Sequence, residues 1–340
     1  MARNIVVIGG GPAAVFAALE AKKRDAAAAV TLVTDEACEP YEKPPLSKAV
    51  LLGKARPEDA PIAGPGGLAA RGVTVMLNAR CDAIDRATHE VVAAGRRIPY
   101  DALVLATGSL MRELPLLPMG MPHVHYLRTE AHAHLLKADL EGRKHLVVVG
   151  AGLIGLEVAA SAAQLGLEVT VIEFAPRVMA RACDEETSAA ILAEHQHHGV
   201  EIELNTAITQ VTPQADGSLA LDTNSGELYV ADIVVVGTGV TPDATLAVAA
   251  GLDVQDGIVV DAQCRTSDPD IFAAGDCTRF PGPQGPVRLE NWRHAQDHGA
   301  VAGRNAAGAG DRYSTVPSYW SEQYDLYVQG VGWPDASAQR

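Results

Sequence analysis

The 340-residue sequence predicts an α/β fold with two similar strand–turn–helix–strand units, the second inserted into the first. An apolar strand at Ile5–Ile8 runs into the glycine-rich turn GGGPAA and then into a helix, and the pattern returns at HLVVVGAGLIG. Each copy continues into a second apolar strand that is followed by an acidic residue. We therefore expect two parallel sheets, each with a glycine turn at the carboxyl end of its first strand.

The first unit has the residue types that a nucleotide pyrophosphate requires. Gly9 permits a tight turn, Gly11 lets the backbone approach a ligand, and Ala14 is small enough for close helix–strand packing. The helix that follows offers free N–H groups to a phosphate. Asp35, after a strand predicted at Val30–Val33, is placed to bind ribose hydroxyls.

The second unit repeats this arrangement. Gly150, Gly152 and Gly155 form its turn, and Glu173 is its acidic residue after the second strand. One such turn is a weak signal, because structural glycines are common, but two copies in the same order are a strong one. They predict two Rossmann-like dinucleotide-binding domains. The alternative, two units that bind no phosphate, does not explain the repeated acids.

Glu173 also predicts which coenzyme is used. Because a 2′-phosphate would meet the Glu173 carboxylate, NADH is expected over NADPH, although Arg177 is close enough in sequence to soften that preference.

Three later segments complete the predicted organisation. Tyr100–Ser109 and Ala231–Asp243 are apolar strands that break at a Thr-Gly turn, where the chain passes a nucleotide or crosses between domains. Thr266–Thr278 is an apolar strand ending in Gly-Asp, and Pro281–Pro286 is predicted to be a loop. We expect a first domain at residues 1–112 and 243–315, an inserted second domain at 113–242, and the start of a small C-terminal α+β domain at 316–340.

Composition narrows the class of protein. A formal net charge of −15 excludes a protein that binds nucleic-acid phosphates through a basic face. The five cysteines form no CxxC pair, which is typical of a reducing compartment. No apolar run reaches membrane-spanning length and the N-terminus does not read as a signal peptide, so we expect a cytoplasmic protein.

The HQHH run, with His195 and His198 one turn apart, is interpreted as a helix C-terminus and not as a metal site. We expect no metal.

The motifs together resemble those of the glutathione-reductase-type flavoproteins. The loop PYEKPPLSK and the segments YLRT, ENWRHA and VPSYWSEQYD are similar to those of the oxygenase-coupled ferredoxin and rubredoxin reductases. The resemblance covers nearly the whole chain. It implies FAD in the first domain, NADH in the second, and a ferredoxin or rubredoxin as the electron acceptor.

The resemblance also implies roles for individual residues. Contacts to FAD are expected from Gly9, Gly11, Ala13, Ala14, Asp35, Lys48, Cys81, Thr107, Gly108, Arg128, Gly275, Asp276, Glu290 and Trp292. Contacts to NAD are expected from Gly150, Gly152, Ile154, Gly155, Glu157, Glu173 and Gly239. Lys48, Glu157 and Trp320 are the expected catalytic residues. Glu157 as an ordinary acid in a first helical turn, and Trp320 as a core residue, remain alternatives.

The PYEKPPLSK loop also separates the possible functions. Relatives with peroxidase or oxidase activity have a cysteine after Leu-Ser, where this chain has Lys48. We therefore expect electrons to leave the flavin singly, without a protein thiol. An NADH oxidase is disfavoured on this ground, whereas a redox-sensing binding protein like the apoptosis-inducing-factor flavoproteins remains an alternative.

Two further expectations concern the surface and the C-terminus. Arg288 and Arg293, with other arginines between Cys277 and Trp320, are either a docking face for an acidic carrier or ordinary solubilising charge. The family normally continues for several tens of residues after the WSEQYD segment. We therefore expect most of the C-terminal domain to be missing from this chain.

Overall fold

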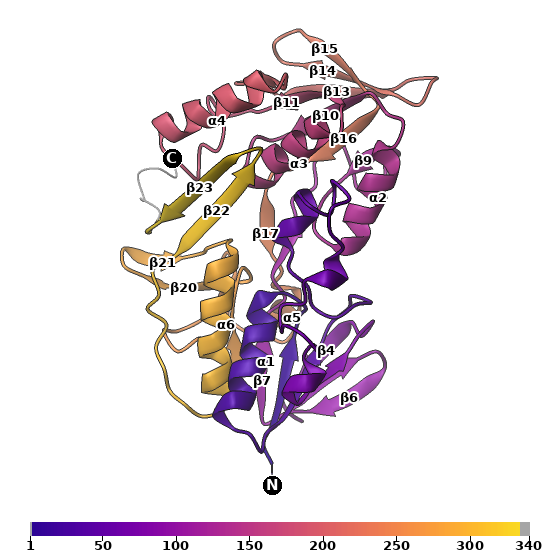
Figure 1. The fold of residues 1–340 in the computed structure, drawn as a ribbon. Coiled ribbons are helices and arrows are strands. Elements are labelled where there is room, and N and C mark those ends of the chain that lie inside the picture. Colours follow the sequence, from indigo (N-terminus) through magenta and orange to yellow (C-terminus); the bar gives the residue numbers. More distant parts are fainter. Residues whose placement is uncertain (1, 334–340) are drawn as a thin grey trace.

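A computed structural model describes residues 2–333, and its framework is two five-stranded parallel sheets, one toward each end of the molecule (Figure 1). The first sheet has the strand order β19-β7-β1-β2-β3. Its strands are β1 (Asn4–Ile8), β2 (Ala29–Val33), β3 (Val73–Met76), β7 (Ala102–Leu105) and β19 (Ile271–Ala273). Because β19 follows the whole second sheet in sequence, the chain leaves the first sheet and later returns to it.

Helices α1 (Pro12–Arg24) and α6 (Trp292–Ala306) cover one face of the first sheet. They approach closely because α6 carries Gly299 and Gly303 at the crossing. A Cβ on Gly299 would lie 2.2 Å from the Ala13 carbonyl oxygen, and one on Gly303 would lie 2.0 Å from that of Ala17. The helix that bears the first glycine turn is thereby fixed against the C-terminal part of the chain.

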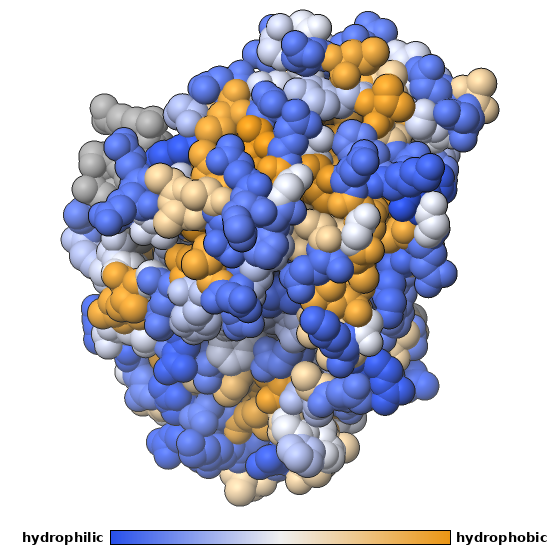
Figure 2. All heavy atoms as spheres, turned by 45° about the horizontal axis from the view of Figure 1, so that its top comes forward, coloured by the Kyte–Doolittle hydropathy of each residue, from blue (hydrophilic) through white to orange (hydrophobic). Residues whose placement is uncertain are grey.

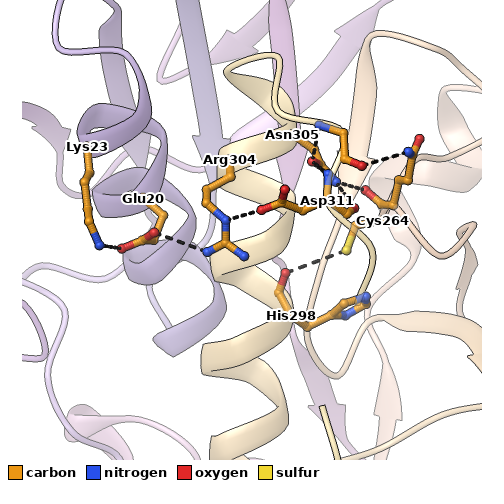
Figure 3. A network of polar contacts seen from close by, with 9 residues as sticks. Glu20, Lys23, Cys264, His298, Arg304, Asn305 and Asp311 are labelled. Atoms are coloured by element: carbon orange, nitrogen blue, oxygen red, sulfur yellow. Dashed lines mark hydrogen bonds and ion pairs between the residues drawn. The ribbon is translucent and has the colours of Figure 1, made fainter. Parts of the chain in front are cut away.

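Polar contacts fix the far end of this helix pair (Figure 3). The Arg304 guanidinium on α6 donates to Asp311 Oδ2 at 2.6 Å and to Glu20 Oε2 of α1 at 3.2 Å. Asn305 donates to the carbonyl oxygen of Asp311 at 2.9 Å and accepts the N–H of Asp311 at 2.7 Å. These contacts lock the turn after α6 onto α1.

The opposite face of the first sheet is covered by smaller elements. A three-stranded antiparallel sheet contributes buried Val91 and Ala93, and the short helix α5 contributes Ala247. This face is built from β4 (Cys81–Asp85), β5 (Glu90–Ala93), β6 (Arg96–Pro99), α5 (Thr245–Ala249) and β18 (Ile258–Val259). Short 3-10 turns lie between β2 and β3, namely η1 (Pro44–Ser47), η2 (Pro57–Asp59) and η3 (Ala69–Arg71).

The second sheet has the order β12-β11-β10-β16-β9. Its strands are β9 (Val124–His125), β10 (His145–Val149), β11 (Glu168–Ile172), β12 (Glu201–Glu203) and β16 (Ile233–Val236). One face packs against α2 (Glu130–Leu140), α3 (Leu153–Gln164) and α4 (Glu185–His197). The other packs against the antiparallel sheet of β13 (Ile208–Pro213), β14 (Leu219–Thr223) and β15 (Leu228–Ala231).

The two crossings between the sheets lie side by side. β8 (Ser109–Met111) leads out of the first sheet, β17 (Val240–Pro242) leads back, and they pair antiparallel. Both follow the Thr-Gly turns noted in the sequence. The domain boundaries themselves stay a prediction.

The predicted loop at Pro281–Pro286 is wrong. The structure has β20 (Thr278–Gly282) and β21 (Gly285–Val287) there, with Pro281 opposite Pro286 in an antiparallel pair. Proline is tolerated where a ladder needs no N–H, and the buried Phe280 ring fixes this hairpin against the core. A second hairpin, β22 (Ser318–Gln323) and β23 (Leu326–Val331), follows α6 and packs on α3. Residues 334–340 of the expected C-terminal domain lie outside the described part.

The surface mixes apolar and charged residues (Figure 2). Within residues 2–333, no helix is both long and apolar enough to cross a membrane.

Candidate active site

The first glycine turn is shaped to receive a ligand. Gly9 has φ +133°, and a Cβ there would lie 2.1 Å from the Ala106 carbonyl oxygen, so only glycine fits. Gly11 is the extended N-cap of α1 and has open space where a Cβ would be. Ala13 and Ala14 are buried at the start of α1. The turn is therefore an open cradle of backbone N–H groups at a helix N-terminus, which fits a pyrophosphate.

Two acids follow β2, and they differ in environment. Asp35 is exposed, as a residue that binds a ribose at the surface would be. Glu36 is tied down, accepting the Tyr41 hydroxyl at 2.6 Å and Lys43 Nζ at 2.7 Å. The Lys43 side chain is only 19% exposed, and burial lowers its pKa while the Glu36 carboxylate opposes that shift. Lys43 is not among the residues that the sequence analysis expects to contact FAD. The only feature of the sequence that pointed to the burial of Lys43 is its position beside Pro44-Pro45 in a stiff loop.

The Lys48 ammonium and the Glu157 carboxylate meet between the two halves of the molecule. Lys48 Nζ lies 3.1 Å from Glu157 Oε1, and the Glu157 side chain is 4% exposed. Ser47 donates to Glu157 Oε2, and Ser321 of β22 donates to Oε1 at 2.8 Å. Ser161 of α3 also donates to the Ser47 carbonyl oxygen at 2.7 Å. Lys48 and Glu157, two of the expected catalytic residues, are therefore in direct contact, and the sequence predicted neither this pairing nor the serine donors.

Asp276 lies at the carboxyl end of the first sheet, as its position after β19 implies. It is half-buried, and Ser109 donates to its Oδ2 at 3.3 Å. Burial raises the pKa of Asp276, and the nearby Arg128 guanidinium opposes this. Gly275 has φ +81°, and a Cβ there would lie 2.8 Å from Ala13 Cβ, so the Gly-Asp turn abuts the first glycine turn.

Arg128 reaches the same place from the segment between β9 and α2. Its guanidinium lies 2.9 Å from where a Cβ on Gly108 would be. Thr107, in the same turn, donates its hydroxyl to the Asp243 carbonyl oxygen at 2.6 Å and so joins the two crossings between the sheets. The structure therefore assembles Arg128, Asp276 and the Thr-Gly turn around one space.

The two tryptophans expected near a flavin lie together. Trp292 at the start of α6 and Trp320 on β22 meet edge to face, with ring centroids 5.9 Å apart, and Phe16 of α1 lies 6.1 Å from Trp292 on another side. Asn291 caps α6 by accepting the His294 N–H at 2.8 Å, which fixes the position of Trp292. Glu290 is exposed and pairs with Arg288.

The second glycine turn repeats the geometry of the first. Gly150 has φ +104°, and a Cβ on Gly155 would lie 2.0 Å from the Gly150 carbonyl oxygen. Gly152 is the extended N-cap of α3 and has open space beside it. Ile154 is exposed by 45% next to this opening. Gly239 has φ +101° and immediately precedes β17. A Cβ on it would lie 3.3 Å from the Arg181 guanidinium.

Glu173 is held at the edge of this turn by two backbone N–H groups. Its Oε2 accepts from Ala151 at 2.5 Å and its Oε1 from Ala175 at 2.7 Å. Arg177 points its guanidinium at the carbonyl oxygens of Cys183 and Ala180, at 2.7 and 2.8 Å. It is therefore occupied by backbone, whereas the Glu173 carboxylate lies beside the turn.

The cysteines are free thiols. Cys81 is buried in β4, and burial raises its pKa to about 11. Cys38, upstream of the PYEKPPLSK loop, has a pKa raised to about 12 by burial and by Glu130. Both are therefore protonated at neutral pH and are poor nucleophiles. Among residues 2–333, no group of three or more His, Cys, Asp or Glu side chains is arranged to hold a metal ion.

His195 has a role that the sequence did not reveal. It is 1% exposed near the end of α4, and its Nε2 lies 2.8 Å from Gln323 Oε1 on β22. Burial lowers its pKa. The HQHH run thus contains a histidine that binds the C-terminal hairpin, while His198 stacks on Tyr324 with ring centroids 3.8 Å apart.

Comparison with known proteins identifies the class. Residues 3–299 match the pyridine nucleotide-disulphide oxidoreductase family, and the chain belongs to that family. It is 40% identical over 97% of its length to rhodocoxin reductase of Rhodococcus erythropolis, covering 78% of that protein. It is 41% identical to the ferredoxin–NAD(+) reductase component of the anthranilate 1,2-dioxygenase system of Burkholderia cepacia, over 96% of this chain and 81% of that one.

A comparison with solved structures points to the same class of protein. The crystal structure of the covalent putidaredoxin reductase–putidaredoxin complex superimposes with a TM-score of 0.91 at 35% identity, covering 97% of this chain and 81% of that chain. These findings confirm the fold class and the family expected from the sequence.

Proposed function

We propose that this protein takes hydride from NADH onto FAD and passes single electrons to a ferredoxin or rubredoxin that supplies an oxygenase. The observation that carries the proposal is the Lys48–Glu157 pair, which joins the loop beside the first nucleotide turn to the helix of the second. We expect two dinucleotides that extend from the two glycine turns to meet beside this pair. Both relatives described above are reductases by name, and one of them is the ferredoxin–NAD(+) reductase component of a dioxygenase system.

FAD is proposed to lie along the first sheet. The open turn at Gly9–Ala14 would receive the pyrophosphate, Asp35 the adenosine ribose, Arg128 the phosphates and Asp276 the ribityl chain. Backbone at Cys81 would face the adenine, and Thr107, Gly108, Gly275, Glu290 and Trp292 would line the remainder. Lys43, buried beside Glu36, adds a cation to this cradle. Bound FAD supplies a centre that accepts two electrons together and releases them one at a time.

NADH is proposed to bind the second turn. Gly150, Gly152, Ile154, Gly155 and Gly239 would surround the pyrophosphate, and Glu173 would accept the ribose hydroxyls. Glu157 and Lys48 would orient the nicotinamide, and Trp320 would cover the reacting region. We further propose the FAD domain as residues 1–112 and 243–315, the NAD domain as 113–242, a C-terminal domain beginning at 316, and a cytoplasmic location.

The environment of the thiols supports release of electrons from the flavin itself. Lys48 occupies the place where relatives with peroxidase or oxidase activity have a cysteine, and the side chains of Lys48 and Ser47 both contact Glu157. The nearest upstream thiol, Cys38, has a pKa raised to about 12. The NADH oxidase alternative therefore has no support from this loop.

The test is turnover. The purified holoenzyme should reduce a small iron–sulfur protein with NADH, measured by bleaching of the iron–sulfur absorbance under anaerobic conditions. Acid precipitation should release a yellow supernatant, because no residue is expected to hold FAD covalently. A protein that binds FAD and NADH but does not turn over with any ferredoxin or rubredoxin would instead be the redox-sensing binding protein.

A further inference from the structure

The C-terminal strand β22 contacts both halves of the molecule. Side chains alternate along a strand, so Tyr319, Ser321 and Gln323 share one face and Trp320 and Glu322 the other. The first face lies on the second domain, where the Tyr319 hydroxyl donates to the Ala182 carbonyl oxygen. Trp320, on the opposite face, meets Trp292 of α6. β22 therefore bridges the two proposed nucleotide domains.

A buried chain of hydrogen bonds runs from α4 through this strand to the active-site carboxylate. His195 Nε2 lies 2.8 Å from Gln323 Oε1, and Gln323 Nε2 donates to Ser321 Oγ at 3.0 Å. Ser321 Oγ in turn donates to Glu157 Oε1 at 2.8 Å. Ser321 and Gln323 are 0% and 2% exposed, so no water replaces these partners readily.

The chain has one consistent direction. A glutamate anion can only accept hydrogen bonds. The Ser321 hydroxyl must therefore donate its hydrogen bond to Glu157 and accept one from Gln323. The carbonyl end of Gln323 then accepts from His195, which is neutral because burial lowers its pKa. Every donor of this chain points toward Glu157, and the arrangement therefore holds the carboxylate in one position.

We propose that Ser321 and Gln323 are positioning residues for hydride transfer: they hold the Glu157 carboxylate against Lys48 and, through the same strand, hold Trp320 against Trp292. This inference rests on the proposed function and adds the C-terminal hairpin to the nicotinamide site. Glu157 belongs to α3, Lys48 follows η1, and Ser321 belongs to β22, so three segments far apart in sequence must dock before the site is complete.

The energetic expectation follows from which bond is removed. In Ser321→Ala, Glu157 loses one donor, and the Gln323 amide loses its oxygen acceptor and keeps only the Met179 sulfur at 3.8 Å. A hydrogen bond to a charged group is stronger than one between neutral groups. The rate constant for flavin bleaching at saturating NADH should therefore fall roughly 10-fold or more. Gln323→Met cuts the chain one bond further from Glu157 and should give a smaller loss in the same direction.

The decisive experiment is a double-mutant cycle in the holoenzyme. Wild type, Ser321→Ala, Glu157→Gln and the double variant are compared by stopped-flow bleaching of the flavin with NADH. If Ser321 acts through Glu157, the double variant should be no slower than Glu157→Gln alone. A second readout, independent of activity, is the NAD+ dissociation constant from tryptophan fluorescence, which should rise several-fold in Ser321→Ala and not further in the double variant.

Glu322→Ala is the matched control, since Glu322 lies on the same strand but is exposed. It should match wild type in both readouts. The inference is overturned if Ser321→Ala, with full flavin content, stays within about twofold of wild type, or if its effect multiplies that of Glu157→Gln. If Ser321→Ala does not retain flavin, Gln323→Met is tested in its place. The inference is then overturned if the effect of Gln323→Met multiplies that of Glu157→Gln, or if Gln323→Met bleaches at the wild-type rate. If Glu157→Gln itself bleaches normally, the assigned role of Glu157 is wrong, and this inference is rejected with it.

Discussion

At the scale of single residues, Glu173 is the proposed determinant of coenzyme choice. Its carboxylate is fixed at the second glycine turn by the N–H groups of Ala151 and Ala175. Arg177, the cation that the sequence offered as a partner for a 2′-phosphate, is bound to backbone carbonyl oxygens. These contacts of Arg177 support the proposed preference for NADH.

Glu173→Arg should move the preference toward NADPH. The carboxylate that repels a 2′-phosphate is replaced by a cation that attracts it, so the ratio of kcat/KM for NADH over NADPH should drop about 10-fold or more, equivalent to about 1.4 kcal/mol. The measurement is dye reduction with each coenzyme. Glu168→Arg, an exposed change at the other end of β11, is the control and should leave the ratio unchanged. A wild-type enzyme that uses both coenzymes equally would contradict the assignment.

Buried histidines make the stability depend on pH. His294 is 0% exposed, its Nδ1 lies 2.8 Å from the Tyr313 hydroxyl, and burial lowers its pKa to about 3. The neighbouring His298 has its pKa lowered in the same way. Because the folded pKa lies below the unfolded value near 6.5, the stability is fully present above about pH 6.5 and is lost as pH falls toward 3.

At pH 5, His294 alone should remove about 2 kcal/mol of unfolding free energy relative to pH 7.5. Urea unfolding of the holoenzyme at the two pH values measures this. In His294→Gln the difference between the two pH values should shrink by a similar amount, whereas the exposed His134→Gln should retain the wild-type difference. If His294→Gln had the same pH dependence as wild type, folding would not lower the pKa of His294, and the prediction would be wrong.

At the scale of elements, the crossing of α1 and α6 determines where the first glycine turn lies. Gly299 and Gly303 let the two helices touch backbone to backbone, and α6 in turn carries Trp292. The same helix pair is tied by Arg304, Glu20 and Asp311 (Figure 3). Helix packing thus links the pyrophosphate turn to the aromatic cluster.

Gly303→Ala should test this link. The added Cβ would lie 2.0 Å from the Ala17 carbonyl oxygen, so the helices must separate. Overpacking of this kind destabilises by about 1–3 kcal/mol, and flavin content should fall as α1 moves. Thermal unfolding and the ratio of flavin to protein absorbance measure both effects. Lys23→Ala, at a side chain 77% exposed on α1, should change neither. Normal unfolding of Gly303→Ala would mean that the helices adapt freely.

At the scale of the whole molecule, charge decides how an acidic carrier approaches. The formal net charge is −15. Three of the five arginines between Cys277 and Trp320 are paired with carboxylates: Arg288 with Glu290 and Asp256, Arg293 with Asp297, and Arg304 with Glu20 and Asp311. The structure therefore favours the second reading of these arginines, as locally neutralised charge.

The encounter with an acidic iron–sulfur protein should accordingly be repulsive. The second-order rate constant for its reduction should rise as ionic strength increases from about 0.01 to 0.15 M, because the screening length shortens from about 30 to 8 Å. Arg288→Ala and Arg293→Ala should change this slope little, and dye reduction should be independent of salt. A rate that falls steeply with salt, and that flattens in either variant, would restore the docking face.

The sequence alone determined the parts that are encoded locally. Glycine turns at Gly9 and Gly150, apolar strands and following acids are short-range patterns, because a tight turn and a buried parallel strand restrict the residues at each position. They predicted both sheets, both turns and the class of protein. The resemblance of the PYEKPPLSK loop made Lys48 a candidate site residue, and its contact with Glu157 appeared only in the structure.

Only the tertiary structure decided what depends on contacts between distant segments. The partners of Glu157 come from η1 and β22, Lys43 is buried by Glu36 and Tyr41, and His195 is bound to Gln323. No periodicity records such pairs, since hydrogen bonds between side chains depend on how whole elements dock. The same holds for the arginines, whose charge was readable in the sequence but whose neutralisation required the fold.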